Sequence, residues 1–263
     1  RALSLSGIWQ TDKVFETPEA VIYDAEFHVL YVSNIGGSPL DRDGDGFISR
    51  LSMKGEVLEL RWIEGLDAPK GMGIRGRTLY VSDIDDLVEI DIEDGKVRKR
   101  YKAEGAIFLN DVAIDGAGRV YVSDYSPDSS AIYRLEADTL TVWKRDSSLQ
   151  RPNGLLVRGD MLIVGVGSDA MLRQIDIADG SISDLAVIGS GIDGIAAAHS
   201  RDLIVSDWQG RTMLVDRNGG IRVLLDTTGE GINSADIWFI EKYDMLLIPT
   251  FNDDRVVACR LNR

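Results

Sequence analysis

Short apolar runs recur along the whole chain and predict β-strands, because none of them keeps a helical period. Six runs share one pattern of consecutive apolar side chains, and five of them lead to a small polar ending. These are LYVSN from Leu30, LYVSD from Leu79, VYVSD from Val120, LIVGV from Leu162, LIVSD from Leu203 and LLIPT from Leu246. The runs follow one another at intervals of 41 to 49 residues, and each lies between further apolar runs separated by turn sequences.

This repeat predicts an all-β fold, a six-bladed β-propeller with four antiparallel strands per blade. We expect a single domain over residues 1–263, with blades starting near residues 17, 67, 106, 150, 191 and 231. The last blade ends before a fourth strand. The strand-like segment within residues 1–16 is therefore expected to close the ring, which leaves no open sheet edge there.

Composition narrows the possible partners and compartments. A chain of 263 residues with 44% hydrophobic residues can bury a large core. Its net charge of −14 argues against nucleic acid or an anionic membrane surface as partner. The single cysteine, Cys259, excludes an internal disulfide framework. The first residue is Arg1 and not methionine, which slightly favours an exported, periplasmic protein over a cytoplasmic one. The oligomeric state stays open.

Polar residues occupy one equivalent position in the six predicted innermost strands. They are Glu19, Lys70, Asn110, Asn153, Asp193 and Asp236, and each directly precedes an apolar run. In a propeller these positions converge at one mouth of the central channel. Such a ring needs partners, because burying polar groups without them is costly. Oxygen donors without His or Cys favour a hard divalent ion, calcium before magnesium. The alternative is a plug of bridging water with Lys70 paired to Asp236.

The loop LDRDGDGFISR, residues 40–50, has the aspartate spacing of an EF-hand calcium loop. A predicted strand follows it instead of a helix, and Ser52 stands where an EF-hand has a bidentate Glu. An EF-hand is therefore excluded. Either an ordinary solvated loop or a weaker calcium site on Asp41, Asp43 and Asp45 remains.

Several motifs around the ring positions resemble the SMP-30/gluconolactonase/luciferin-regenerating-enzyme family of six-bladed propellers. These motifs are TPEAVIYD around Glu19, FLNDVAIDGAGRVYVSD around Asn110, RPNGLLV around Asn153 and GIDGIAA around Asp193. The resemblance implies a small-molecule substrate and one catalytic divalent metal, Ca²⁺ or another cation such as Mg²⁺, Mn²⁺ or Zn²⁺. It implies Glu19, Asn153 and Asp193 as ligands, with Asn110 beside the substrate or in the metal shell.

The same resemblance implies hydrolysis of a lactone or related ester. Asp193, at the edge of the metal, is the candidate catalytic base. Phe108 stands where sugar-lactonase members often carry an arginine, so a less polar substrate is expected. Lys70 and Asp236 are further candidate substrate-binding residues. The second hypothesis is a non-catalytic propeller that binds a small molecule or peptide at the mouth, with a structural metal.

Overall fold

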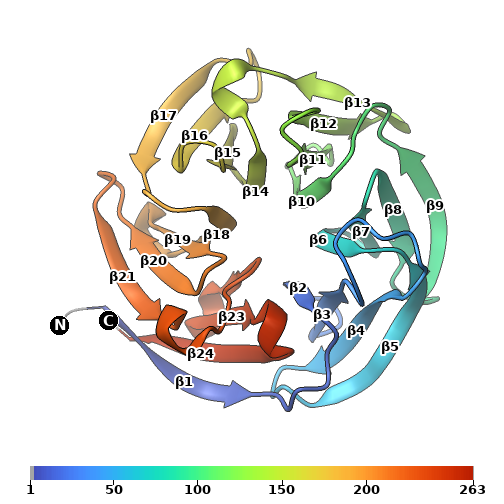
Figure 1. The fold of residues 1–263 in the computed structure, drawn as a ribbon, viewed down its shortest axis with the longest axis vertical. Coiled ribbons are helices and arrows are strands. Elements are labelled where there is room, and N and C mark those ends of the chain that lie inside the picture. Colours follow the sequence, from blue (N-terminus) through green and yellow to red (C-terminus); the bar gives the residue numbers. More distant parts are fainter. Residues whose placement is uncertain (1–2, 263) are drawn as a thin grey trace.

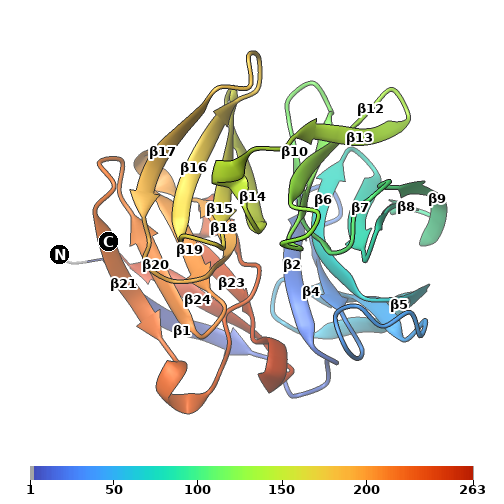
Figure 2. The ribbon, with the colours of Figure 1, turned by 45° about the horizontal axis from the view of Figure 1, so that its top comes forward.

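The computed structural model describes residues 3–262 and shows a ring of six four-stranded antiparallel sheets around a central channel (Figure 1). This confirms the predicted six-bladed β-propeller. Within each of blades 1 to 5 the strands follow one another from the channel outward, so that every connection is a hairpin. Figure 2 shows the same sheets tilted, each packing face to face against the next.

The first three blades span residues 18–144. Blade 1 contains β2 (Pro18–Asp24), β3 (Val29–Asn34), β4 (Gly46–Ser52) and β5 (Val57–Leu66). Blade 2 contains β6 (Pro69–Arg75), β7 (Thr78–Asp83), β8 (Asp86–Asp91) and β9 (Lys96–Lys102). Blade 3 contains β10 (Leu109–Ile114), β11 (Val120–Asp124), β12 (Ala131–Glu136) and β13 (Thr139–Lys144).

The other blades complete the ring, with short 3₁₀ helices in some connections. Blade 4 follows η1 (Ser147–Leu149) and contains β14 (Pro152–Arg158), β15 (Met161–Val166), β16 (Met171–Asp176) and β17 (Ile182–Val187). Blade 5 contains β18 (Ile192–Ala197), η2 (His199–Arg201), β19 (Leu203–Asp207), β20 (Arg211–Val215) and β21 (Ile221–Asp226). Blade 6 follows η3 (Thr228–Glu230) and contains β22 (Trp238–Ile240), η4 (Glu241–Tyr243), β23 (Met245–Pro249), η5 (Phe251–Asp253) and β24 (Val256–Asn262).

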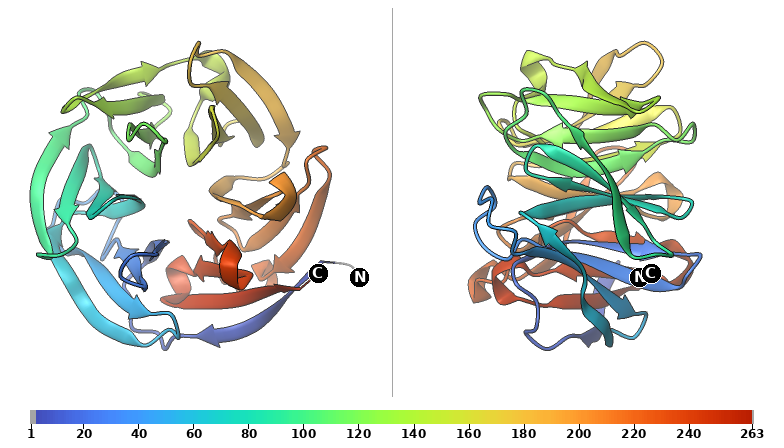
Figure 3. Two further views of the ribbon diagram at one scale, coloured as in Figure 1. Left: turned by 180° about the vertical axis from the view of Figure 1, so that it is seen from behind. Right: turned by 90° about the vertical axis from the view of Figure 1, so that its right-hand side faces the viewer.

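The N-terminal strand closes the ring. β1 (Ser4–Gln10) pairs antiparallel with β24 as the outermost strand of blade 6, from Ser4 opposite Asn262 to Gln10 opposite Val257. Consequently the first and the last strand of the chain lie side by side at the rim (Figure 3). Trp9 in β1 also donates its indole N–H to the Met53 carbonyl of blade 1 at 3.1 Å, which ties the closing strand to the next blade.

The hydrophobic core lies between neighbouring blades. Inner strands such as β7 and β11 are buried on both faces, whereas outer strands such as β9 are mostly exposed. The repeated Tyr of the LYVSD-type runs is fully buried between blades, as at Tyr31, Tyr80 and Tyr121. No helix in the described part of the chain is both long and apolar enough to pass through a membrane.

Candidate functional site

The predicted ring residues lie in β-bulges. In blades 1 to 5 the innermost strand slips its register against the second strand at the ring position, as between Pro18 and Ala20 in β2 and between Pro152 and Leu155 in β14. A bulge leaves a residue out of the hydrogen-bonded ladder and redirects its side chain. The ring side chains are therefore turned away from the pleat of their strands, and all six are buried.

The bulges also bring neighbouring innermost strands close together. A Cβ on Gly154 would lie 2.3 Å from the Asp193 carbonyl oxygen, and one on Gly194 would lie 2.5 Å from the Ile237 nitrogen. Both distances are shorter than any real Cβ contact. The glycine that follows the ring residue in these motifs is thus required by close backbone approach and not by a turn.

The repeated Ser of the YVSD-type runs fixes each bulge to the next blade. Ser123 Oγ accepts the Asp111 N–H at 3.0 Å and donates to the Asn153 carbonyl at 2.8 Å. Ser33 in blade 1 likewise donates to the Lys70 carbonyl at 2.7 Å. Each hydroxyl joins a ring residue to the blade before it, so the repeat motif holds the spacing of the ring.

Five of the six ring residues line one pocket at the channel mouth. This pocket, with a volume of about 420 Å³, is lined at its polar end by Glu19, Lys70, Asn110, Asn153 and Asp193. Sequence reasoning therefore places these five together correctly. Phe108, the other candidate substrate contact, lines the same pocket.

Asp236 lies elsewhere. It lines a separate cavity of about 210 Å³ in the lower channel, whose other walls are mainly aliphatic. Its backbone N–H donates to the Glu19 carbonyl at 2.9 Å, so it remains next to the ring without facing the mouth.

Two buried oxygens in the mouth have no hydrogen-bond partner among the residues that the structure describes. They are Glu19 Oε2 and Asn153 Oδ1. Asn153 donates its Nδ2 to Asp193 Oδ1 at 3.1 Å, which leaves its own oxygen free to face the pocket. Buried acceptors without donors are costly, and a bound cation would satisfy them. The residues present therefore fit a divalent ion held by Glu19, Asn153 and Asp193.

The donor set decides which kind of ion fits. Among the described residues no three side chains drawn from His, Cys, Asp and Glu are grouped so that they could hold a metal ion. The predicted set instead combines the carboxylates of Glu19 and Asp193 with the amides of Asn153 and Asn110. An all-oxygen set with amide donors suits a hard cation such as Ca²⁺ better than Zn²⁺.

Burial controls the electrostatics of the mouth. Burial, with the charges of Asp193 and Asp111, raises the pKa of Glu19 well above its usual range. Burial and the charge of Asp111 raise the pKa of Asp193 to about 7, against the opposing hydrogen bond from Asn153. The carboxylates thus resist ionising together, because buried like charges close to one another disfavour the ionised form of each.

Asp111 is a neighbour of this site that sequence reasoning missed, and it lines the lower cavity together with Asp236. It is buried directly after Asn110, and its carboxylate accepts the Val112 and Leu155 N–H groups, each at 2.6 Å. It also shares a hydrogen bond with Asp236, and burial raises the pKa of Asp111 to about 7. A sequence signal did exist, because glycine follows the ring residue in blades 2, 4 and 5, whereas blade 3 has a carboxylate there.

Lys70 is held by backbone carbonyls. Its Nζ donates to the Pro39 oxygen at 2.7 Å and to the Ala68 oxygen at 2.8 Å. Burial lowers the pKa of Lys70 to about 8, although the charge of Glu19 acts in the opposite direction. Pro39 belongs to the loop between β3 and β4, so this loop contacts the mouth directly.

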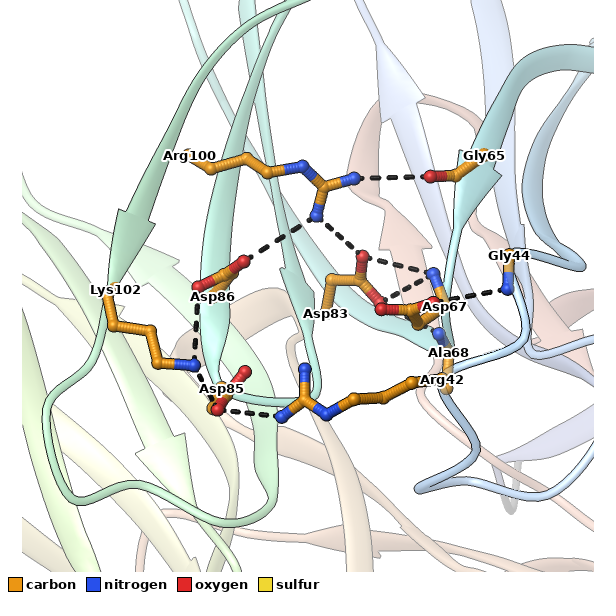
Figure 4. Close-up of polar contacts among 10 residues, drawn as sticks. All are labelled: Arg42, Gly44, Gly65, Asp67, Ala68, Asp83, Asp85, Asp86, Arg100 and Lys102. Atoms are coloured by element: carbon orange, nitrogen blue, oxygen red, sulfur yellow. Dashed lines mark hydrogen bonds and ion pairs between the residues drawn. The ribbon is translucent and has the colours of Figure 1, made fainter.

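The same loop is attached to blade 2 (Figure 4). Arg42 pairs with Asp85 at 2.7 Å, and the Gly44 N–H donates to Asp67 at 3.1 Å. Asp41, Asp43 and Asp45 are exposed. The three aspartates thus lie on the side of the loop that faces solvent. Other residues of the loop contact blade 2 and attach the loop to it.

The Asp that ends the second strand has a structural role in the same region. Asp83 accepts the backbone N–H groups of Asp67 and Ala68, and Arg100 donates to it at 3.0 Å (Figure 4). It therefore fixes the segment that leads into β6. Asp124 holds the N–H of Phe108 in the same way, at 3.0 Å, in blade 3.

Both histidines lie far from the mouth. His28 is in the turn between β2 and β3 and hydrogen-bonds to the Tyr23 hydroxyl at 2.8 Å. His199 is in η2 between β18 and β19 and pairs with Glu241 and Asp244, each at 2.7 Å. These turns lie at the opposite ends of the innermost strands from the ring residues, so neither imidazole reaches the pocket.

Comparisons with known proteins give similarity in fold. No known family's sequence profile matches the chain, and no curated protein matches it. A solved structure provisionally assigned as a gluconolactonase has a TM-score of 0.74 at 16% identity, with 99% of this chain and 92% of that chain covered. Virginiamycin B lyase from Staphylococcus aureus, solved with quinupristin, has a TM-score of 0.70 at 15% identity, with 99% and 100% covered. A streptogramin B lyase has a TM-score of 0.69 at 13% identity, with 99% and 98% covered. The chain is therefore similar in fold to propellers of more than one activity.

Proposed function

We propose that the chain is a metal-dependent hydrolase of a lactone or related carboxylic ester. The observation that carries the proposal is the pair of unpartnered buried oxygens, Glu19 Oε2 and Asn153 Oδ1, in the same pocket as Asp193. Glu19, Asn153 and Asp193 would hold the ion, with Asn110 beside it. We favour Ca²⁺ over Mg²⁺, Mn²⁺ or Zn²⁺ because every donor is an oxygen. When bound, such an ion would polarise a substrate carbonyl and stabilise negative charge on its oxygen.

Asp193 is the residue proposed to move the proton. Its Oδ1 is fixed by the Asn153 amide at 3.1 Å, which orients the carboxylate. The carboxylate takes a proton from the attacking water while the water oxygen bonds to the carbonyl carbon. The acyl C–O bond then breaks, and Asp193 returns the proton to the leaving alkoxide. The Asn110 side chain, also in the pocket, would hydrogen-bond to the substrate.

The residues that line the mouth favour a hydrolase over a lyase that depends on histidine. One neighbour is provisionally assigned as a gluconolactonase, whereas the catalytically inactive variant of virginiamycin B lyase replaces a histidine with alanine. Among the described residues that line the mouth pocket here there is no histidine. A lyase reaction that requires a histidine side chain therefore lacks that side chain among the described residues of this mouth.

The test combines metal binding with turnover. Native mass spectrometry of protein freed of metal should show uptake of one Ca²⁺, and a panel of lactones should include a substrate whose hydrolysis stops with chelator. Asp193→Asn keeps an oxygen ligand but removes the base, so kcat should fall by about a hundredfold or more. Glu19→Gln should weaken Ca²⁺ binding by about tenfold or more, because it removes a charged ligand.

Asp160→Asn, in the exposed turn between β14 and β15, is the matched control and should change neither quantity. A wild-type protein that binds no divalent metal would overturn the proposal. Metal binding without hydrolysis of any lactone would favour the non-catalytic binding propeller instead. Hydrolysis that survives both chelator and Asp193→Asn would move the chemistry away from this ring.

A further inference from the structure

Two aromatic pairs form walls of the mouth pocket. Phe108 and Tyr125 meet edge to face, with ring centroids 5.5 Å apart and planes at 88°. Trp208 and Phe251 meet in the same way at 5.4 Å and 78°. The first pair comes from blade 3 and the second from blades 5 and 6. Blades 3 and 6 face each other across the channel (Figure 1), so Phe251 comes from the blade opposite the Phe108–Tyr125 pair, and Trp208 comes from the adjacent blade 5.

One of these rings is held in place against backbone strain. Phe251 has a φ of 48°, in the left-handed region that bulky residues rarely adopt. The surrounding hydrogen bonds impose this conformation. The Asp254 N–H donates to the Phe251 carbonyl at 3.1 Å. The Thr250 N–H donates to the Arg255 carbonyl, and the Thr250 hydroxyl accepts the Arg255 N–H. Strain of this kind persists where the surrounding structure fixes it and is concentrated at functional sites.

The described lining of the pocket offers little hydrogen-bonding capacity to an anionic group of a substrate. Lys70 is the single Lys or Arg among the described residues that line it, and its ammonium is bonded to two carbonyls and lies 4.9 Å from the Phe108 ring. Asp207, which also lines the pocket, is paired with Arg211 at 2.8 Å. Apart from the ion that Glu19 and Asp193 would hold, an anionic group on the ligand would therefore meet the one remaining N–H of Lys70 and otherwise mainly apolar walls.

We propose that the substrate is a neutral lactone or ester whose acyl or alcohol part carries an aromatic or similarly flat apolar ring. This inference rests on the hydrolase proposed above and names its substrate class. The carbonyl would lie at the polar end with Glu19, Asn153 and Asp193, and the ring would lie between the aromatic walls. A pocket of about 420 Å³ has room for a bicyclic molecule. Polyhydroxylated sugar lactones and anionic esters are expected to be poor substrates, because the walls offer them mainly apolar surface.

The kinetic test compares dihydrocoumarin, an aromatic lactone, with D-glucono-1,5-lactone. The wild type should prefer dihydrocoumarin in kcat/KM by at least about tenfold, which corresponds to the loss of one good aromatic contact. Trp208→Ala and Phe108→Ala should each raise KM for dihydrocoumarin by about tenfold with little change in kcat. Phe27→Ala is the matched control, because Phe27 is 40% exposed, as Trp208 is at 41%, and lies in the β2–β3 turn away from the mouth.

A binding test separates this inference from the proposed reaction. 3,4-Dihydroquinolin-2-one, the lactam that matches dihydrocoumarin, should bind the wild type in calorimetry, and Trp208→Ala should weaken it by about tenfold. Lactam binding without lactone hydrolysis would contradict the hydrolase and leave the assigned ligand class standing. Hydrolysis of gluconolactone in preference to dihydrocoumarin, without lactam binding, would overturn the ligand class and leave the hydrolase standing.

Discussion

Two candidate metal ligands follow residues with an unfavourable backbone conformation. Thr17 and Arg151 both have a φ of 56°, and each precedes a proline that is followed by Glu19 or Asn153. Residues before proline favour extended backbone, and non-glycine residues in the left-handed region are strained. Hydrogen bonds hold this turn, since the Gly167 N–H donates to the Arg151 carbonyl at 2.8 Å. The sharp entry directs the ligand toward the channel axis.

This interpretation predicts an unusual ranking of two substitutions at Arg151. Arg151→Gly should give a more stable protein than Arg151→Val, by about 1–2 kcal/mol, because valine tolerates a positive φ least. Both variants remove the guanidinium that lies 5.0 Å from the Tyr125 ring, so the comparison isolates the backbone. Urea denaturation measures the difference.

The same pair at Arg158, the last residue of β14, provides the control. There valine should be the more stable of the two, because glycine weakens a strand. Equal stability of the two Arg151 variants would show that the left-handed turn carries no strain.

The candidate site could be predicted residue by residue only where it follows the repeat. Glu19, Asn110, Asn153 and Asp193 stand at the same point of blades 1, 3, 4 and 5, so superposing the blades identifies them. Asp111 stands one position later and projects into the channel from a bulge, and an alternating strand pattern would have assigned it to the other face. A search for alternating apolar and polar residues does not detect the register shift in the innermost strands. The glycines that follow the ring residue in blades 2, 4 and 5 are the sequence signal for it.

At the scale of the element, the loop between β3 and β4 has two different sides. Its aspartates, Asp41, Asp43 and Asp45, are exposed as the sequence pattern suggests, whereas Pro39 lines the mouth and Arg42 pairs with Asp85. Figure 3 shows this blue loop standing out from one face of the disc. The aspartate spacing could be read from the sequence, but the contacts with blade 2 could not, because they join residues that no local pattern connects.

A pair of loop variants separates the two sides. Replacing Asp41, Asp43 and Asp45 together with Asn should change the free energy of unfolding by no more than about 0.5 kcal/mol and leave Ca²⁺ binding intact. Arg42→Gln should likewise cost little stability, since Arg42 is half exposed and Lys102 still pairs with the buried Asp85, but should raise KM because the loop carries Pro39 into the pocket. Calorimetric Ca²⁺ titration and steady-state kinetics measure both. Loss of Ca²⁺ binding in the triple variant would place the metal in the loop and not in the ring.

At the scale of the whole molecule, the propeller was predictable because each blade is a local unit. Four successive strands joined by hairpins need only short-range pairing, and the repeated Tyr and Ser of the YVSD-type runs mark the surfaces where blades meet. Closure by β1 was inferred from a missing strand, since a ring with an open edge would leave backbone groups unpaired. The ring of polar residues forms only in the assembled propeller, because each blade contributes one residue to it. Its carboxylates become neighbours only when all six blades assemble.

Because the assembled ring buries these carboxylates, the free energy of unfolding of the metal-free protein should fall as pH rises. Proteins whose carboxylates have lowered pKa values show the opposite trend. Burial raises the pKa values of Asp111 and Asp193 to about 7 in the folded chain, against about 3.9 for unfolded aspartate. Between pH 5 and pH 7 the folded state therefore binds more protons than the unfolded state, so the free energy of unfolding falls as pH rises. We expect a loss of at least about 2 kcal/mol over this range in urea denaturation of chelator-treated, desalted protein.

Excess Ca²⁺ should reverse this slope, because the ion binds the ionised ring of the folded state only and its contribution grows as the carboxylates lose their protons. Asp111→Asn should flatten the slope of the metal-free protein, since it removes one of the coupled carboxylates. Asp160→Asn, on the exposed turn, should leave the slope unchanged. A metal-free wild type that gains stability from pH 5 to pH 7, with no further gain from Ca²⁺, would mean that the buried ring is satisfied by its own hydrogen bonds and holds no cation.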